Sequence, residues 1–222
     1  MSLALENLTK IRQNIEKACK SWQRNYEDVS LIAVSKNFPK KDVLALLQEG
    51  QLIFGENRVQ EAYEKYPELK QLYPQLQLHL IGPLQSNKAK LAVSLFDCIH
   101  TIDREKIARV LAEEMHQQKK YLPCYVQVNV GNEPQKAGIK IEETEDFVLK
   151  CQKEYHLNII GLMCIPPVNE NPGPYFALLQ KKAQKITLPK LSMGMSEDYE
   201  AAICFGATAV RIGSAIFGKR IN

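Results

Sequence analysis

The sequence predicts an α/β protein, a single (β/α)8 TIM barrel with an extra N-terminal helix. Short apolar runs alternate with amphipathic segments along the whole chain. Eight strand–helix units can be counted, and such units require right-handed crossovers and a parallel sheet. Eight units within 222 residues favour a closed barrel over an open sheet. No linker or low-complexity segment divides the chain, so we expect one domain over residues 1–222.

The opening segment and the strands follow from hydrophobic periodicity. Leu8, Ile11 and Ile15 recur at helical spacing, which predicts an amphipathic helix that ends near Trp22. Runs of four to eight mostly apolar residues then predict buried parallel strands. We expect these strands over residues 29–36, 52–55, 78–82, 98–102, 124–130, 158–164, 190–193 and 209–213.

The helices between the strands are predicted from amphipathic pattern and from their end signals. Gly50 and Gly206 follow apolar-periodic segments and are typical helix stops. Asp103 precedes a periodic segment, so we expect it to be an N-cap. The expected helices cover residues 42–48, a segment from 56 onward, and residues 87–95, 103–116, 141–155, 175–185 and 196–204.

Composition argues against several functional classes. Lysine plus arginine exceeds aspartate plus glutamate by only four, with scattered positions, so nucleic-acid binding gains no support. No apolar run approaches the roughly 20 residues that span a membrane, and the N-terminus is helical rather than a signal peptide. The six cysteines form no C-x-x-C pair and lie largely in apolar runs. We therefore expect a cytoplasmic protein without membrane or nucleic-acid partners.

Lys36 ends the first predicted strand and is the main candidate functional residue. Strand side chains alternate, so Lys36 should point the same way as Ile32 and Val34, from a packed interior toward the barrel mouth. Apolar surroundings disfavour an ammonium ion and leave more free amine, which condenses with aldehydes. Lys36 is thus a Schiff-base candidate. The alternative, a lysine that extends into solvent, is the more common situation for this residue type.

Two further strand ends indicate a phosphate site. Gly213 and Ser214 follow the eighth predicted strand, and Ser196 stands at the start of the helix after the seventh. Barrels often bind phosphate with these two loops, where backbone N–H groups point at the anion. Each residue alone is also explained as a turn or a helix cap. A phosphate site that faces Lys36 predicts a pocket for a phosphorylated aldehyde.

Arg211 should point into the barrel together with Gly213. An inward arginine needs acceptors for its N–H groups, and either a ligand ring nitrogen or the carboxylate of Glu56 would serve. If the acceptor is a pyridine nitrogen, arginine cannot protonate it, and the ring would be a weak electron sink. The histidines lack metal-binding spacing, so we expect no metal and interpret His79 and His100 as hydrogen-bonded core residues.

These motifs, taken together, closely resemble the pyridoxal phosphate homeostasis protein family, and the likeness spans nearly the whole chain. The resemblance implies a barrel similar to the N-terminal domain of alanine racemase, with pyridoxal 5′-phosphate held as an internal aldimine on Lys36. It also implies phosphate contacts at Ser196, Gly213 and Ser214, Arg211 near the ring nitrogen, and Asn57 beside the ring. The motifs that carry the likeness are residues 32–36, 54–57, 79–88, 161–163, 191–196 and 210–218.

The resemblance implies a carrier rather than an enzyme. Such a protein keeps the reactive vitamin B6 aldehyde at safe levels, affects amino-acid and keto-acid balance, and could pass the cofactor to apo-enzymes. We expect a monomer.

Two alternatives remain open, a pyridoxal-phosphate-dependent amino-acid racemase and a phosphate-binding barrel in which Lys36 is structural. Racemisation needs a second acid/base group opposite Lys36, which alanine racemase takes from another domain. We expect none here, because no tyrosine falls at a predicted strand end and the sequence ends soon after the last strand.

Overall fold

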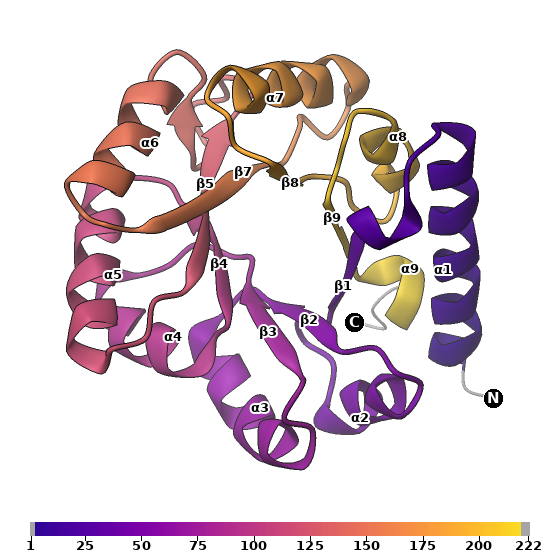
Figure 1. The fold of residues 1–222 in the computed structure, drawn as a ribbon. Helices are drawn as coiled ribbons and strands as arrows, with labels where there is room; N and C mark the ends of the chain where they lie inside the picture. The colour runs from indigo at the N-terminus through magenta and orange to yellow at the C-terminus, as the bar shows by residue number, and fades with distance from the viewer. Residues whose placement is uncertain (1–2, 219–222) are drawn as a thin grey trace.

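The computed structural model describes residues 3–218, whose strands form a closed parallel barrel ringed by helices (Figure 1). Each barrel strand pairs in parallel with its neighbours, and pairing of the fourth with the fifth closes the ring. This confirms the predicted (β/α)8 fold. The barrel strands are β1 (Ser30–Val34), β2 (Ile53–Glu56), β3 (Gln77–Leu80), β4 (Cys98–Ile102), β5 (Pro123–Asn129), β7 (Asn158–Cys164), β8 (Lys190–Ser192) and β9 (Ala209–Ile212).

Seven helices connect successive barrel strands and lie on the outside of the ring. Short 3₁₀ turns, η1 (Tyr26–Asp28) and η2 (Ser86–Lys88), precede β1 and α4. A two-residue strand, β6 (Ile139–Lys140), pairs with β5 outside the ring and was not predicted. The connecting helices are α2 (Lys40–Gln48), α3 (Val59–Leu72), α4 (Ala89–Leu95), α5 (Glu105–Gln118), α6 (Thr144–Lys153), α7 (Gly173–Lys185) and α8 (Tyr199–Cys204).

The predicted N-cap at Asp103 is wrong. Helix α5 begins at Glu105, and Arg104 occupies the N-cap position without a side-chain cap. The Asp103 carboxylate is instead paired with the Arg104 guanidinium at 2.5 Å. An ionic partner therefore takes the oxygen that would otherwise accept from the helix N-terminus.

The extra N-terminal helix is present as α1 (Leu3–Ser21), and it occupies the place of an eighth barrel helix. Within the described residues, the last strand is followed by α9 (Ser214–Phe217), a single turn that the sequence pattern did not predict. Helix α1 lies beside α8 and α9 and covers this side of the ring (Figure 1). Asn7 donates from Nδ2 to the Ile216 carbonyl at 3.0 Å, which joins the two ends of the described chain.

Apolar side chains fill the space between strands and helices, whereas the interior of the barrel is partly polar. Leu31 and Ala33 belong to the main apolar core, and Ile32 and Val34 lie outside that cluster. This division follows the alternation of side chains along β1. Barrel interiors usually hold bulky branched residues. Here they include His100, Ser192 and Arg211, all buried.

These polar residues form a continuous hydrogen-bonded chain across the barrel. Arg211 donates to Ser192 Oγ at 2.6 Å, Ser192 Oγ lies 2.8 Å from His100 Nδ1, and His100 Nε2 lies 3.0 Å from His79 Nδ1. The His100 ring also stacks on Tyr125, with centroids 4.3 Å apart. Both imidazoles are hydrogen-bonded core residues, as expected. Burial lowers the pKa of His79 to about 4 and that of His100 well below its ordinary value.

The lowered pKa of His79 predicts a stability loss in mild acid. The unfolded chain takes up this proton as the pH falls below 6.5, whereas the folded chain resists protonation until about pH 4. The stability that neutral His79 contributes is therefore fully present above pH 6.5. It is lost as the pH falls from 6.5 to about 4, by at most roughly 3 kcal/mol. Urea unfolding of His79→Gln at several pH values should show a free energy of unfolding that depends less steeply on pH than in wild type. The exposed His116→Gln is the control. A slope equal to that of wild type would contradict the prediction.

Candidate functional site

A pocket of about 670 Å³ opens at the carboxyl ends of the barrel strands. It is lined by residues at the ends of β1, β2, β8 and β9 and by the proline-rich loop between β7 and α7. Four of these strands are consecutive neighbours in the ring. The structure brings all six sequence-predicted binding residues to this one pocket: Lys36, Asn57, Ser196, Arg211, Gly213 and Ser214.

Lys36 lies just beyond β1 rather than within it. The strand ends at Val34, so the predicted strand was two residues too long. The Ser35 carbonyl accepts from Phe38 N at 3.0 Å, and Asn37 has φ +64, which makes Lys36 the second residue of a type II turn. The half-buried Lys36 side chain nevertheless faces the pocket, because alternation continues through Ser35.

Arg211 places a buried positive charge at the inner wall of the pocket. Its side chain donates to Ser192 Oγ and, at 2.8 Å, to the carbonyl oxygen of Cys164. Both partners are neutral. Desolvation lowers the pKa of Arg211, and Asp198 counteracts this through space. Within the described residues its hydrogen bonds thus go to neutral groups, an environment suited to an anionic or hydrogen-bond-accepting ligand.

Glu56, the alternative partner for Arg211, is on the other side of the barrel wall. Its carboxylate is fully buried against α3, where Lys65 donates to it at 2.7 Å. Gly55, which precedes Glu56 in β2, and Asn57, which directly follows the strand, both face inward. Alternation therefore directs Glu56 outward, and its proposed pairing with Arg211 is wrong.

Asn57 presents a buried amide oxygen to the pocket. Within the described residues, Oδ1 has no hydrogen-bond partner. Unpaired buried polar atoms are rare and costly, so a donor from a ligand fits this position. A Cβ on Gly82 would lie 2.3 Å from the Asn57 backbone oxygen, and the absent side chain lets the two segments pack together.

The residues predicted to bind phosphate come from two loops that touch each other. Ser196 Oγ accepts a hydrogen bond from Ala215 N at 3.2 Å, which brings Ser196 next to the start of α9. Gly213 holds the N-cap position of that short helix, and Ser214 is its first residue. The predicted role of Ser196 as the first residue of a helix is wrong, because α8 begins at Tyr199 and has Asp198 at its N-cap. The hydroxyl bridges the two loops instead.

Sequence reasoning missed the groups that hold Arg211. Ser192 is the nearest of them, and it lies within a motif already noted for its other residues. Ser192 pairs with Ala209 on the next strand, and Ala209 lies two residues before the inward Arg211. Alternation along β9 therefore indicates that Ala209 and its partner Ser192 face inward as well. The need of a buried arginine for acceptors could have identified it. The Phe38 ring, stacked on Phe217 at 4.6 Å, was also missed.

Beneath the pocket, three potential metal ligands lie close together. The ligand atoms of His79, Cys98 and His100 are within 4.8 Å of one another, a grouping that their sequence spacing did not indicate. The two facing ring nitrogens are already hydrogen bonded to each other. Burial also raises the pKa of Cys98 and keeps it a thiol, which is a poor metal ligand.

Comparisons with known proteins place this site in a family. The family model described as the N-terminal domain of alanine racemase matches residues 7–220. The pyridoxal phosphate homeostasis proteins of Haemophilus influenzae and Escherichia coli are 42% and 37% identical to the chain. Both alignments cover 96% of it, with 94% and 95% of the relatives covered. The chain belongs to the pyridoxal phosphate homeostasis protein family. Members matched here are named as homeostasis proteins rather than as enzymes.

Solved structures agree with this family assignment. PipY of Synechococcus elongatus, determined with PLP bound, is 34% identical, with a TM-score of 0.80 over 92% of this chain and all of that one. Alanine racemase of Clostridium difficile has a TM-score of 0.74 at 15% identity, and the match covers 99% of this chain but 57% of the racemase. That likeness concerns the fold alone. Within residues 3–218, no helix has the length and apolar character needed to cross a membrane.

Proposed function

We propose that this protein binds pyridoxal 5′-phosphate in the pocket described above and serves the intracellular homeostasis of this vitamin B6 cofactor. One observation carries the proposal most directly. A buried guanidinium, whose hydrogen bonds within the described residues go to neutral groups, shares a pocket with a lysine and with two serine-bearing loops. The ligand that fits combines negative charge with an electrophile, and a phosphorylated aldehyde has both.

The fit assigns a role to each residue. Lys36 would hold the cofactor through its amine, which can condense with the aldehyde carbon and release water. Ser196, Gly213 and Ser214 hold the phosphate through hydroxyl and backbone donors, and the Arg211 guanidinium faces the ring nitrogen. Asn57 lies beside the ring, where its buried oxygen meets a donor. When bound, the cofactor supplies an aldehyde that condenses reversibly with amines and is attached to an electron-withdrawing ring.

The proposed role is that of a carrier, not of an enzyme. Arginine donates a hydrogen bond to a ring nitrogen but does not protonate it, so the chain does not increase the ability of the ring to withdraw electrons. Within residues 3–218, no tyrosine is among those that line the pocket. We also propose a monomer that acts as one domain in the cytoplasm and passes cofactor to apo-enzymes. Six free cysteines support the reducing compartment.

Replacement of Lys36 tests the covalent linkage. Lys36→Ala should bind the cofactor only non-covalently and lose the visible Schiff-base absorbance, because the attacking amine is gone. Borohydride reduction followed by peptide mass spectrometry should find the modified lysine in wild type and in the exposed control Lys41→Ala. An equally stable adduct at another lysine of Lys36→Ala would rule out the assignment.

The two serines test the phosphate site. Ser196→Ala and Ser214→Ala should each weaken cofactor binding by about 1–3 kcal/mol, the range for a lost hydrogen bond to a charged group. The linkage to Lys36 should still form with excess cofactor. Titration by absorbance measures both effects, with the exposed Ser94→Ala as a matched control. Wild-type affinity in both pocket variants would place the phosphate elsewhere.

The carrier role predicts no useful racemisation. Inversion requires proton removal on one face of the substrate and return on the other, and Lys36 supplies only one of these groups. The holoprotein can be incubated with L-alanine and other L-amino acids in deuterated water, with Cα exchange and chirality followed over time. Turnover in the ordinary enzyme range of about 1–10³ per second would favour the racemase alternative.

A further inference from the structure

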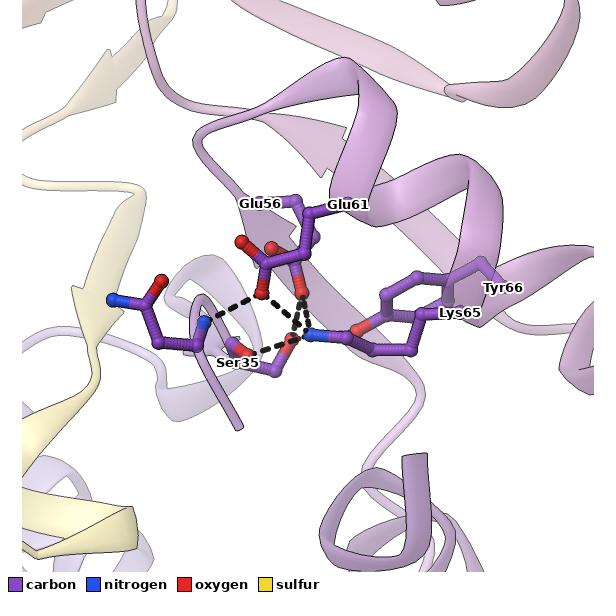
Figure 2. A network of polar contacts seen from close by, with 6 residues as sticks. Ser35, Glu56, Glu61, Lys65 and Tyr66 are labelled. Carbon is purple, nitrogen blue, oxygen red and sulfur yellow. Dashed lines mark hydrogen bonds and ion pairs between the residues drawn. The ribbon is translucent and has the colours of Figure 1, made fainter. Parts of the chain in front are cut away.

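The turn that carries Lys36 is held from outside the barrel by side chains of α3 (Figure 2). Lys65 donates from Nζ to the carbonyl oxygen of Ser35 at 2.9 Å. Glu61 accepts the backbone N–H of Asn37 at its Oε1, at 2.5 Å. The residues immediately before and after Lys36 are thus both bound through their backbone to one helix.

Lys65 is the centre of this support. Its ammonium also donates to Glu56 Oε1 at 2.7 Å and to Glu61 Oε1 at 3.1 Å, so three acceptors match its three donors. The Lys65 side chain is only 7% exposed, and that of Glu56 is fully buried. Desolvation raises the pKa of Glu56, and the contacts with Lys65 act in the opposite direction.

Ser35 is anchored through its side chain as well. Its hydroxyl donates to Glu56 Oε1 at 2.7 Å and lies 2.6 Å from the Tyr66 hydroxyl. Because Ser35 has one hydroxyl hydrogen, Tyr66 is the donor in the second bond. Burial raises the pKa of Tyr66 well above its ordinary value, which keeps that hydrogen in place.

The backbone that these contacts hold has a conformation that few residues adopt freely. Asn37 has φ +64, in the left-handed region, where asparagine is among the better tolerated side chains. Such positions persist where surrounding contacts over-determine them. Here a turn hydrogen bond, Lys65 and Glu61 all act on the same four-residue turn.

Stability alone is a weak explanation for this network. Buried ion pairs add little net stability, because desolvation offsets most of the attraction. None of the five residues labelled in Figure 2 lines the pocket, so none is placed to touch a ligand. What the network does touch is the backbone on each side of Lys36.

We propose that Lys65, with Glu61, is a positioning residue that sets the direction in which the Lys36 amine enters the pocket. This inference rests on the proposed function, since it concerns the residue that bonds to the cofactor. Condensation needs the amine aligned with the aldehyde carbon, and displacement of a reacting group by about 1 Å can lower a rate roughly 100-fold.

Two probes separate positioning from pocket formation. Pyridoxal 5′-phosphate can condense with Lys36, whereas pyridoxine 5′-phosphate has the same ring and phosphate with an alcohol in place of the aldehyde. Stopped-flow absorbance gives the rate of C=N formation with the first probe. Calorimetry gives the affinity for the second, which does not depend on the lysine bond.

Glu61→Ala should slow C=N formation roughly tenfold or more and leave the pyridoxine 5′-phosphate affinity within about twofold of wild type. Glu61→Gln keeps an oxygen that can accept from Asn37 and should recover most of the rate. Glu64 is exposed on the same helix, so Glu64→Ala is a matched control with wild-type behaviour expected.

Lys65→Met leaves the buried Glu56 charge unpaired and could unfold the protein. The double variant Lys65→Met/Glu56→Gln removes both charges and tests Lys65 in a folded chain, as judged by circular dichroism. It should show the same slow condensation with retained pyridoxine 5′-phosphate affinity. A wild-type rate in this variant and in Glu61→Ala would overturn the proposal, as would an equal loss of rate and affinity.

The wild-type protein distinguishes this inference from the function on which it rests. If wild type binds neither probe, the proposed function fails. If wild type links to the cofactor at Lys36 and the α3 variants behave identically, only the positioning role fails.

Discussion

A guanidinium charge inside a barrel is the constraint on which this site depends. Removing Arg211 from water is costly, and the structure offsets that cost with two neutral acceptors, the hydroxyl of Ser192 and the carbonyl oxygen of Cys164. Neutral acceptors satisfy N–H groups but do not cancel the charge. The guanidinium therefore keeps its positive charge at the inner wall of the pocket, and among the described residues no carboxylate competes with a ligand for its hydrogen bonds.

The same charge gives a direction to the hydrogen bonds beneath it. Arginine only donates, so Ser192 accepts from it and is left with its own hydrogen for His100 Nδ1. His100 then carries its hydrogen on Nε2 and donates to His79 Nδ1. Arg211 and His79 both oppose protonation of His100, whose pKa is lowered mainly by burial. The chain of bonds thus keeps positive charge at the pocket and both imidazoles neutral.

The parts of the fold that could be predicted are those encoded by local periodicity. Eight buried strands each leave an apolar run, and their alternation with amphipathic segments is enough to indicate a barrel. Element ends were less predictable, because Asp103 and Ser196 resemble helix caps but their side-chain oxygens have other partners, the adjacent Arg104 and the distant Ala215. The short elements β6 and α9 span too few residues to show a period.

The pocket residues could be predicted because barrel topology brings strand ends to one face. Their supporting contacts could not be predicted in the same way. The role of Lys65 depends on which face of α3 meets β1 and β2, and helical periodicity gives only a buried face. The partner of Arg211 was predictable in part, since alternation along β2 excludes Glu56 and alternation along β8 favours Ser192.

The backbone at the end of β1 has α3 on one side and the pocket on the other, and the two sides would meet different requirements of the proposed carrier. Under the proposed function, the lysine would have to be placed well enough to react, and its bond to the cofactor would also have to be released to an acceptor by exchange at the same carbon. On the outer side, a largely buried network of hydrogen-bonded groups holds Ser35 and Asn37. On the inner side, the half-buried Lys36 side chain faces a pocket that opens to solvent. Because the two sets of contacts share no side chain, cofactor can enter or leave without disturbing the turn. The entropy cost of ordering this backbone is then met once, on folding, and not at each binding event.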